Sequence, residues 1–179
     1  MRQTTIARNY AEALLVLAGR DKDLRGWGSL IQGFADAVRG DAKLRAFLET
    51  PRVDAGRKNA IISKALATKA PSKFVRFMES LVRHRRQMLV GEIAIQYMDL
   101  VDRAENRMHA HVTVARETDD KARKMIADRL SKIFERTVVP HLTVDGRILG
   151  GMIVRVGDTV MDGSARRKLG ALRQRMLAR

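Results

Sequence analysis

The chain of 179 residues contains no cysteine. This absence excludes disulfides and thiolate metal sites, and it fits a reducing compartment. Long hydrophobic runs are also absent, because no stretch of 18 apolar residues occurs, so the sequence predicts no membrane-spanning helix. The first amphipathic segment begins within a few residues of Met1, so we expect no secretory or transit peptide.

Aromatic residues are scarce, at 4% of the chain, although the formal net charge is +15. A basic balance first suggests nucleic acid or an anionic membrane surface. However, residues 1–105 carry 19 basic and 12 acidic groups and residues 106–179 carry 16 and 8, so the charge is spread over both halves. Because no aromatic platform for stacking bases is present, the pattern favours a solvated basic surface facing acidic protein partners. A basic nucleic-acid-binding bundle is the alternative.

The apolar content of 45% is sufficient for a core, and the length allows one or two domains. Up to residue 105, apolar residues recur at helical spacing, and short connections make successive helices antiparallel neighbours in a six-helix bundle. Asp54 is a candidate cap of the fourth helix. The apolar stripes that indicate these helices are Ile6, Tyr10, Ala13 and Leu17; Leu24, Trp27, Ile31, Phe34 and Val38; Leu44, Phe47 and Leu48; Ile61, Ile62, Ala65 and Leu66; Phe74, Phe77, Met78 and Leu81; and Met88, Leu89, Ile93, Tyr97 and Val101.

The pattern changes at residue 106, and residues 106–179 are predicted to form a small α+β unit, so the whole chain belongs to the α+β class. Residues 109–115 alternate, with Ala110, Val112 and Val114 on one face of a strand. A helix capped by Asp119 or Asp120 follows. Asp145-Gly146, between two β-rich runs that end at Val144 and begin at Ile148, predicts a hairpin. Another turn is expected at Gly157-Asp158, followed by a helix over 165–178 capped by Ser164 or Asp162.

No residue set in the sequence predicts catalysis, a cofactor or a metal. His109 and His111 share a strand face, but two ligands without a third make a poor zinc site. The glycines of 146–151 lack the Gly-Lys-Ser/Thr ending of a phosphate loop, so Gly150 and Gly151 are interpreted as a bulge or a close backbone approach. Turn and cap positions explain Asp158 and Asp162 without acid–base chemistry. We therefore expect neither an enzyme nor a small-molecule substrate.

The first helix has an unusual composition, because Ala13 to Ala18 reads Ala-Leu-Leu-Val-Leu-Ala, apolar on all sides. A surface helix normally keeps a polar face. Such a helix is either central and buried, or it lies beside a groove that receives an amphipathic helix from another chain. Both interpretations remain open at this point.

Four motifs in order along the chain resemble the delta subunit of bacterial F-type ATP synthase, the family that includes the oligomycin-sensitivity-conferring protein. They are Ala7-Arg8-Asn9-Tyr10-Ala11-Glu12-Ala13-Leu14, Phe47-Leu48-Glu49-Thr50-Pro51, Leu81-Val82-Arg83-His84-Arg85-Arg86, and the glycine-rich segment from Leu149 to Ser164. The resemblance covers almost the whole chain. One departure is the basic run from Arg83 to Arg86, where the family more often has Asn-Gly or Lys-Arg.

The resemblance implies a non-catalytic peripheral-stalk subunit on the cytoplasmic face of the bacterial inner membrane, associated peripherally through the complex. Residues 1–105 are expected to bind the N-terminal helix of an alpha subunit in a groove between the first and fifth helices. Residues 106–179 are expected to bind the C-terminal ends of the b subunits. No nucleic acid is expected as a partner. Candidate groove residues are Tyr10, Ala13, Leu14, Leu17, Arg76, Phe77 and Ser80, and the C-terminal structural signature comprises Gly150, Gly151, Asp162, Gly163 and Ser164.

Overall fold

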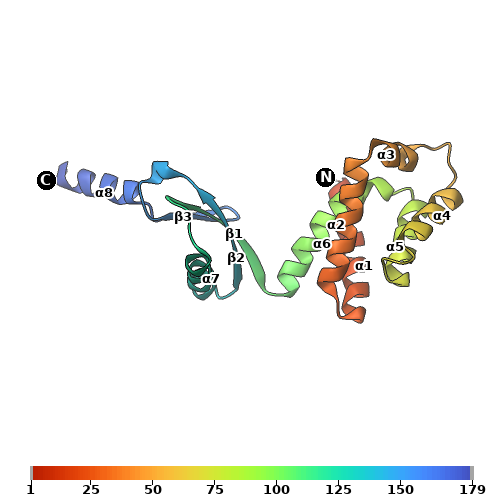
Figure 1. The fold of residues 1–179 in the computed structure, drawn as a ribbon, viewed down its shortest axis with the longest axis horizontal. Helices are drawn as coiled ribbons and strands as arrows, with labels where there is room; N and C mark the ends of the chain where they lie inside the picture. Colours follow the sequence, from red (N-terminus) through yellow and green to blue (C-terminus); the bar gives the residue numbers. More distant parts are fainter. Residues whose placement is uncertain (1, 178–179) are drawn as a thin grey trace. The chain divides into compact units, whose positions relative to one another are not determined.

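The computed structural model describes residues 2–177 and confirms an α+β chain (Figure 1). By its internal contacts the chain divides into two compact units, Met1–Asp102 and Arg103–Arg179. The elements in order are α1 (Arg2–Asp21), α2 (Leu24–Gly40), α3 (Ala42–Glu49), α4 (Ala55–Leu66), α5 (Ser72–Arg83), the short 3-10 helix η1 (Gln87–Leu89), α6 (Val90–Ala104), β1 (Arg107–Val114), α7 (Asp120–Phe134), β2 (Thr137–Val144), the short 3-10 helix η2 (Gly146–Ile148), β3 (Met152–Val156), β4 (Thr159–Asp162) and α8 (Ala165–Leu177).

Carboxylate caps set the starts of several helices. The side chains of Asp23, Asp41, Asp54 and Asp119 accept hydrogen bonds from backbone N–H groups in the first turns of α2, α3, α4 and α7. An acidic oxygen at this position satisfies donors that have no partner within the helix. The prediction of Asp54 as a cap is therefore confirmed, and Asp119 rather than Asp120 caps α7.

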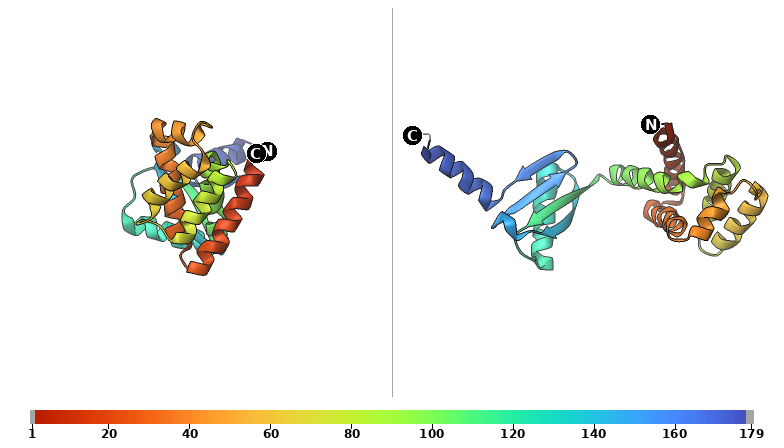
Figure 2. Two further views of the ribbon diagram at one scale, coloured as in Figure 1. Left: turned by 90° about the vertical axis from the view of Figure 1, so that its right-hand side faces the viewer. Right: turned by 90° about the horizontal axis from the view of Figure 1, so that it is seen from above.

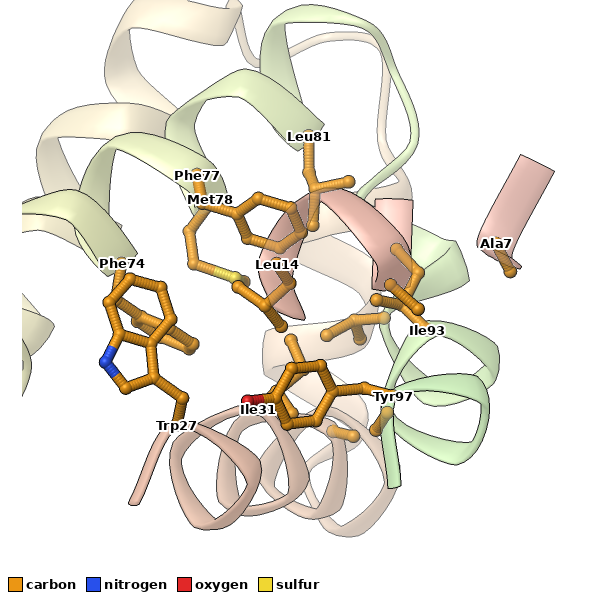
Figure 3. Close-up of a cluster of buried hydrophobic side chains, with 14 of the residues drawn as sticks. Ala7, Leu14, Trp27, Ile31, Phe74, Phe77, Met78, Leu81, Ile93 and Tyr97 are labelled. Atoms are coloured by element: carbon orange, nitrogen blue, oxygen red, sulfur yellow. The ribbon is translucent and has the colours of Figure 1, made fainter. Parts of the chain in front are cut away.

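One hydrophobic core receives side chains from all of α1 to α6. The α5 stripe predicted from the sequence is fully buried, and Trp27 of α2 packs edge-on against Phe74 with ring centroids 5.7 Å apart. Tyr97 of α6 reaches the same core, and its hydroxyl donates a hydrogen bond to the carbonyl of Leu24 at 2.8 Å. Figure 3 shows Leu14 between Phe77 and Tyr97.

The apolar stripe of α1 that the sequence indicated is not the face that the structure buries. The structure buries Ala7, Ala11, Leu14 and Ala18, whereas Ile6, Tyr10 and Leu17 are half-buried and Ala13 is exposed. Small alanine side chains allow the α1 backbone to approach the other helices closely, so the larger residues flank the contact. Three residues of the other stripes, Ile61, Ala65 and Met88, are also exposed.

The C-terminal unit contains a four-stranded sheet in the order β2-β1-β3-β4. Strand β1 pairs in parallel with β2 and antiparallel with β3, and β3 pairs antiparallel with β4 around the predicted Gly157-Asp158 turn. Helix α7 connects the two parallel strands, as such pairs require. It lies against the sheet (Figure 2, right), where Ile126 and Leu130 join the predicted apolar face of β1 in a second core.

The predicted hairpin at Asp145-Gly146 is wrong, because β2 and β3 lie on opposite sides of β1. The Asp145 N–H donates to the carbonyl of Val114 at the end of β1. The Asp145 carboxylate accepts from the backbone and guanidinium of Arg147, which starts η2. Leu149 then adopts a left-handed conformation with φ 61°. These contacts carry the chain past the end of β1 instead of folding it back along β2.

Candidate protein-binding surfaces

Helices α1 and α5 meet along a line that contains most of the predicted groove residues. Tyr10 contacts Phe77 edge-on, with ring centroids 6.2 Å apart. The start of α5 is held beside the end of α1 by an ion pair between Lys73 and Asp21. Ser80 is half-buried, and Arg76 is exposed and has no hydrogen-bond or ion-pair partner within residues 2–177. We call Tyr10, Ala13, Leu17, Arg76 and Ser80 the α1–α5 surface, whereas the predicted groove residue Phe77 is only 7% exposed and belongs to the core beneath it.

Leu14 does not belong to the accessible part of this surface. Its side chain is 0% exposed and lies within the core, so it supports α1 from inside. By contrast, Val16, which the sequence did not single out, is 58% exposed on the same helix. A large exposed apolar side chain two residues from a fully buried one shows that α1 is not covered on all sides. The interpretation of α1 as a central, buried helix is therefore excluded.

The C-terminal signature joins the strands β3 and β4 to α8. The Asp162 carboxylate accepts a hydrogen bond from the N–H of Ser164 at 2.9 Å. Hydrogen bonding to Ser164 lowers the pKa of Asp162 below its ordinary value. The buried Ser164 hydroxyl accepts from the N–H of Arg167 at 3.2 Å, which caps α8. Of the two predicted caps, Ser164 is therefore the one that caps α8, and Asp162 instead holds the turn that precedes the helix. The last residue of the predicted helix, Ala178, lies outside the described residues.

Of the two signature glycines that precede β3, Gly151 is the one that the backbone requires. Its φ is 77°, and a Cβ placed on it would lie 2.4 Å from the carbonyl oxygen of Gly163. Gly150 has room, because its nearest neighbour would be the Cβ of Ala165 at 3.7 Å. The Gly150 carbonyl accepts from the N–H of Ala165 at 2.9 Å. The segment therefore builds the fold through close backbone packing, and the expectation that Gly150 itself is constrained is wrong.

A third histidine joins the two that share a face of β1. His141 of β2 lies opposite His111 in the parallel register, and its Nε2 is 2.8 Å from Nδ1 of His109 in a hydrogen bond. No local pattern predicts this neighbour, because the pairing of β1 with β2 brings His141 there. Within the part of the chain that the structure describes, no three potential ligands are arranged to hold a metal ion. Nor does any helix in that part have the length and apolar character needed to cross a membrane.

The chain as a whole is similar to known proteins of one family. The family described as "ATP synthase delta (OSCP) subunit" matches residues 6–176. The ATP synthase subunit delta of Gemmatimonas aurantiaca is 58% identical over 172 residues, covering 96% of this chain and 93% of the relative. That of Bordetella petrii is 34% identical over 176 residues, covering 98% of each.

A solved structure shares the fold at low sequence identity. A chain of the mitochondrial ATP synthase hexamer of Toxoplasma gondii, determined by electron cryo-microscopy, matches with a TM-score of 0.61 and 16% identity over 97% of this chain and 98% of that chain. The shared fold is consistent with the family match, which covers nearly the whole chain. The chain belongs to the ATP synthase delta (OSCP) subunit family, whose members are non-catalytic accessory subunits of the ATP synthase complex.

Proposed function

We propose that this chain is a stator subunit that links the catalytic alpha/beta head of an F-type ATP synthase to the b subunits of the peripheral stalk. Residues 1–105, as a six-helix bundle, bind the N-terminal helix of an alpha subunit. Residues 106–179 bind the C-terminal ends of b. The chain associates peripherally, through the complex, with the cytoplasmic face of the bacterial inner membrane. Its role is mechanical, because it holds the head against the torque of the rotating shaft during proton-driven ATP synthesis.

The observation that carries the proposal is the exposed apolar side of α1. Val16 is exposed, as is Ala13 one turn earlier, on a segment with no polar residue between Ala13 and Ala18. Exposed apolar surface of this kind is typical of a partner-binding site. An amphipathic helix that packs along α1 would remove this apolar surface from water. The binding free energy then becomes more favourable by roughly 25 cal/mol for each Å² of apolar surface buried.

The α1–α5 surface offers such a helix half-buried apolar side chains as well as an exposed one. Tyr10 and Leu17 are half-buried, so each presents part of its side chain while the rest is fixed in the core. Ala13 lies between them and permits close approach because it has only a methyl group. Arg76 at the edge is free to pair with an acidic residue of the partner. Preorganised apolar anchors of this kind slow dissociation, as a stator requires.

Helix α8 supports the second contact, with b. Leu169, Leu172 and Met176 recur at helical spacing, and all three are exposed. The remaining exposed positions of the helix include Arg166, Arg167, Lys168 and Arg173. A helix with an uncovered apolar stripe beside basic residues fits an amphipathic, acidic partner helix.

Titration of a synthetic peptide from the alpha N-terminal helix tests the first contact. We expect saturable one-to-one binding to the full chain. Ala13→Asp introduces an unpaired charge into a contact that excludes water, at a cost of several kcal/mol, so the affinity should fall by about a hundredfold or more. The matched control is Ala60→Asp, the same change at an exposed position within α4. It should bind the peptide normally.

Circular dichroism completes the experiment, because Ala13 is exposed and both variants should remain helical. If Ala13→Asp binds the peptide as tightly as the parent, the α1–α5 surface is not the alpha site. If Ala13→Asp unfolds while Ala60→Asp does not, Ala13 is part of the core and the assignment fails.

A further inference from the structure

The basic turn between α5 and η1 is not used by the proposed function. It contains Arg83, Arg85 and Arg86 within four residues. None of the three guanidinium groups has a carboxylate partner within residues 2–177. The only side chain of the turn with a hydrogen bond to the fold is His84, whose Nδ1 lies 2.8 Å from the carbonyl oxygen of Ser80, among these described residues. The turn therefore presents uncompensated positive charge.

A cavity of about 420 Å³ opens beside this turn, between the end of α3 and the start of α4. Arg83 and Arg85 line it, and Arg86 does not. The carboxylates of Glu49 and Asp54 also line it. The Asp54 carboxylate already caps α4, because it accepts a hydrogen bond from the N–H of Arg57 at 2.9 Å. The cavity lies away from α1 and from the α1–α5 surface.

The inner wall of the cavity is polar and almost fully buried. Lys58 is 5% exposed, and its Nζ donates to the carbonyls of Leu48 and Thr50 at 2.7 and 2.8 Å. Gln87 is 8% exposed, and its Nε2 donates to the same Leu48 carbonyl at 2.8 Å. This bond fixes the orientation of the amide, because only the nitrogen can donate. The Gln87 Oε1 is left buried with no hydrogen-bond partner. A buried acceptor without a donor is costly.

We propose that this cavity docks an acidic peptide segment of a partner protein. A carboxylate of the segment pairs with the guanidinium groups of Arg83 and Arg85. The proposal concerns a second surface and does not rest on binding of alpha or b. Arg83 and Arg85 line the cavity without a carboxylate partner among the described residues, and a ligand that carries a carboxylate supplies one.

Size and lining favour a peptide over other anions. Ligand cavities usually span about 300–1,000 Å³, and this one is larger than a single inorganic anion needs. The lining contains no aromatic residue on which a nucleic-acid base could stack. The carboxylates of Glu49 and Asp54 at the cavity also disfavour a polyphosphate chain more than a single carboxylate.

The test uses the full chain and the blocked peptide acetyl-Leu-Glu-Asp-Leu-amide, with acetyl-Leu-Gln-Asn-Leu-amide as its neutral counterpart. Amide chemical shifts measured by NMR should move saturably around Leu48, Lys58 and Gln87 with the acidic peptide alone. The double variant Arg83→Gln/Arg85→Gln should bind it about tenfold more weakly or worse, because charge-assisted hydrogen bonds are lost. Arg86→Gln makes the same change in the same turn outside the cavity, and it should bind normally.

Several results overturn the proposal. They are the absence of a saturable shift up to about 10 mM peptide, equal binding of the neutral peptide, and equal weakening by Arg86→Gln, which would indicate a general charge effect. Inorganic phosphate or a short single-stranded oligonucleotide that displaces the peptide at lower concentration would assign the cavity to a different anion. Both altered arginines are exposed, so the double variant should remain folded, and unchanged spectra outside the cavity verify this.

Discussion

Replacing Gly151 by alanine should loosen the C-terminal unit, whereas the same change at its neighbour Gly150 should not. Gly151 has a φ of 77°, and a non-glycine residue in the left-handed region costs roughly 1–2 kcal/mol. The new Cβ would lie 2.4 Å from the carbonyl oxygen of Gly163. This oxygen belongs to the backbone that links β4 to α8, so relief requires a backbone shift, and such overpacking costs about 1–3 kcal/mol.

The unfolded chain offsets part of this cost. A Gly→Ala change removes conformational freedom from the unfolded state and stabilises the fold by about 0.4–1 kcal/mol where the geometry allows it. For Gly151→Ala, the net loss of stability is then about 1–5 kcal/mol. For Gly150→Ala, the nearest contact is an ordinary 3.7 Å, so we expect a neutral effect or a small gain. The two adjacent positions therefore form a matched pair.

Hydrogen exchange followed by mass spectrometry resolves the two units separately. In Gly151→Ala, the amides of β1 and β3 should exchange faster, by about tenfold for each 1.4 kcal/mol lost. The amides of α2 serve as an internal control and should not change. Equal protection of β1 and β3 in the two variants would refute the reasoning, and so would a larger effect at Gly150.

Three further predictions follow from individual contacts. Tyr97→Phe removes the 2.8 Å hydrogen bond to the carbonyl of Leu24 and should lower the free energy of unfolding by about 1 kcal/mol in urea titrations; no change would show that the bond contributes nothing. Arg147 lowers the pKa of Asp145 from 3.8 to about 2, so this carboxylate stabilises the fold above pH 3.8 and loses its effect as the pH falls towards 2. The stability difference between parent and Asp145→Asn, measured by urea unfolding, should shrink across that interval, and a constant difference contradicts this. Trp27 is 0% exposed, so its fluorescence should be that of a buried indole, and a water-exposed spectrum contradicts the core assignment.

The sequence predicted those parts of the fold that depend on local patterns. The α5 stripe from Phe74 to Leu81 was correct, because its apolar residues are large and the opposite face is polar. The prediction that Ala110, Val112 and Val114 share one face of a strand was also correct, because alternate residues of a strand point to the same face of the sheet. On α1 the apolar residues surround the helix, so periodicity could not identify the buried face, and close packing of alanines decided it.

Contacts distant in sequence could not be predicted in the same way. The Asp145-Gly146 pair has hairpin chemistry, but β1 already occupies the edge at which β3 would have paired with β2. His109 and His141 lie close together only because β1 and β2 pair in this parallel register. For the candidate binding surface, the sequence indicated the apolar character of α1, whereas the exposure of Val16 and the burial of Leu14 required the packed structure.

The most direct test of the central claim is a bridging measurement with purified parts. The C-terminal soluble segment of b is immobilised, and retention of the alpha/beta head is measured with and without this chain. We predict that the head is retained only when the chain is present. Ala13→Asp should be captured by b without the head, and Leu172→Asp, which places a charge on the exposed stripe of α8, should not be captured at all. Retention of the head with Ala13→Asp, or failure of b to capture the parent chain, would contradict the account.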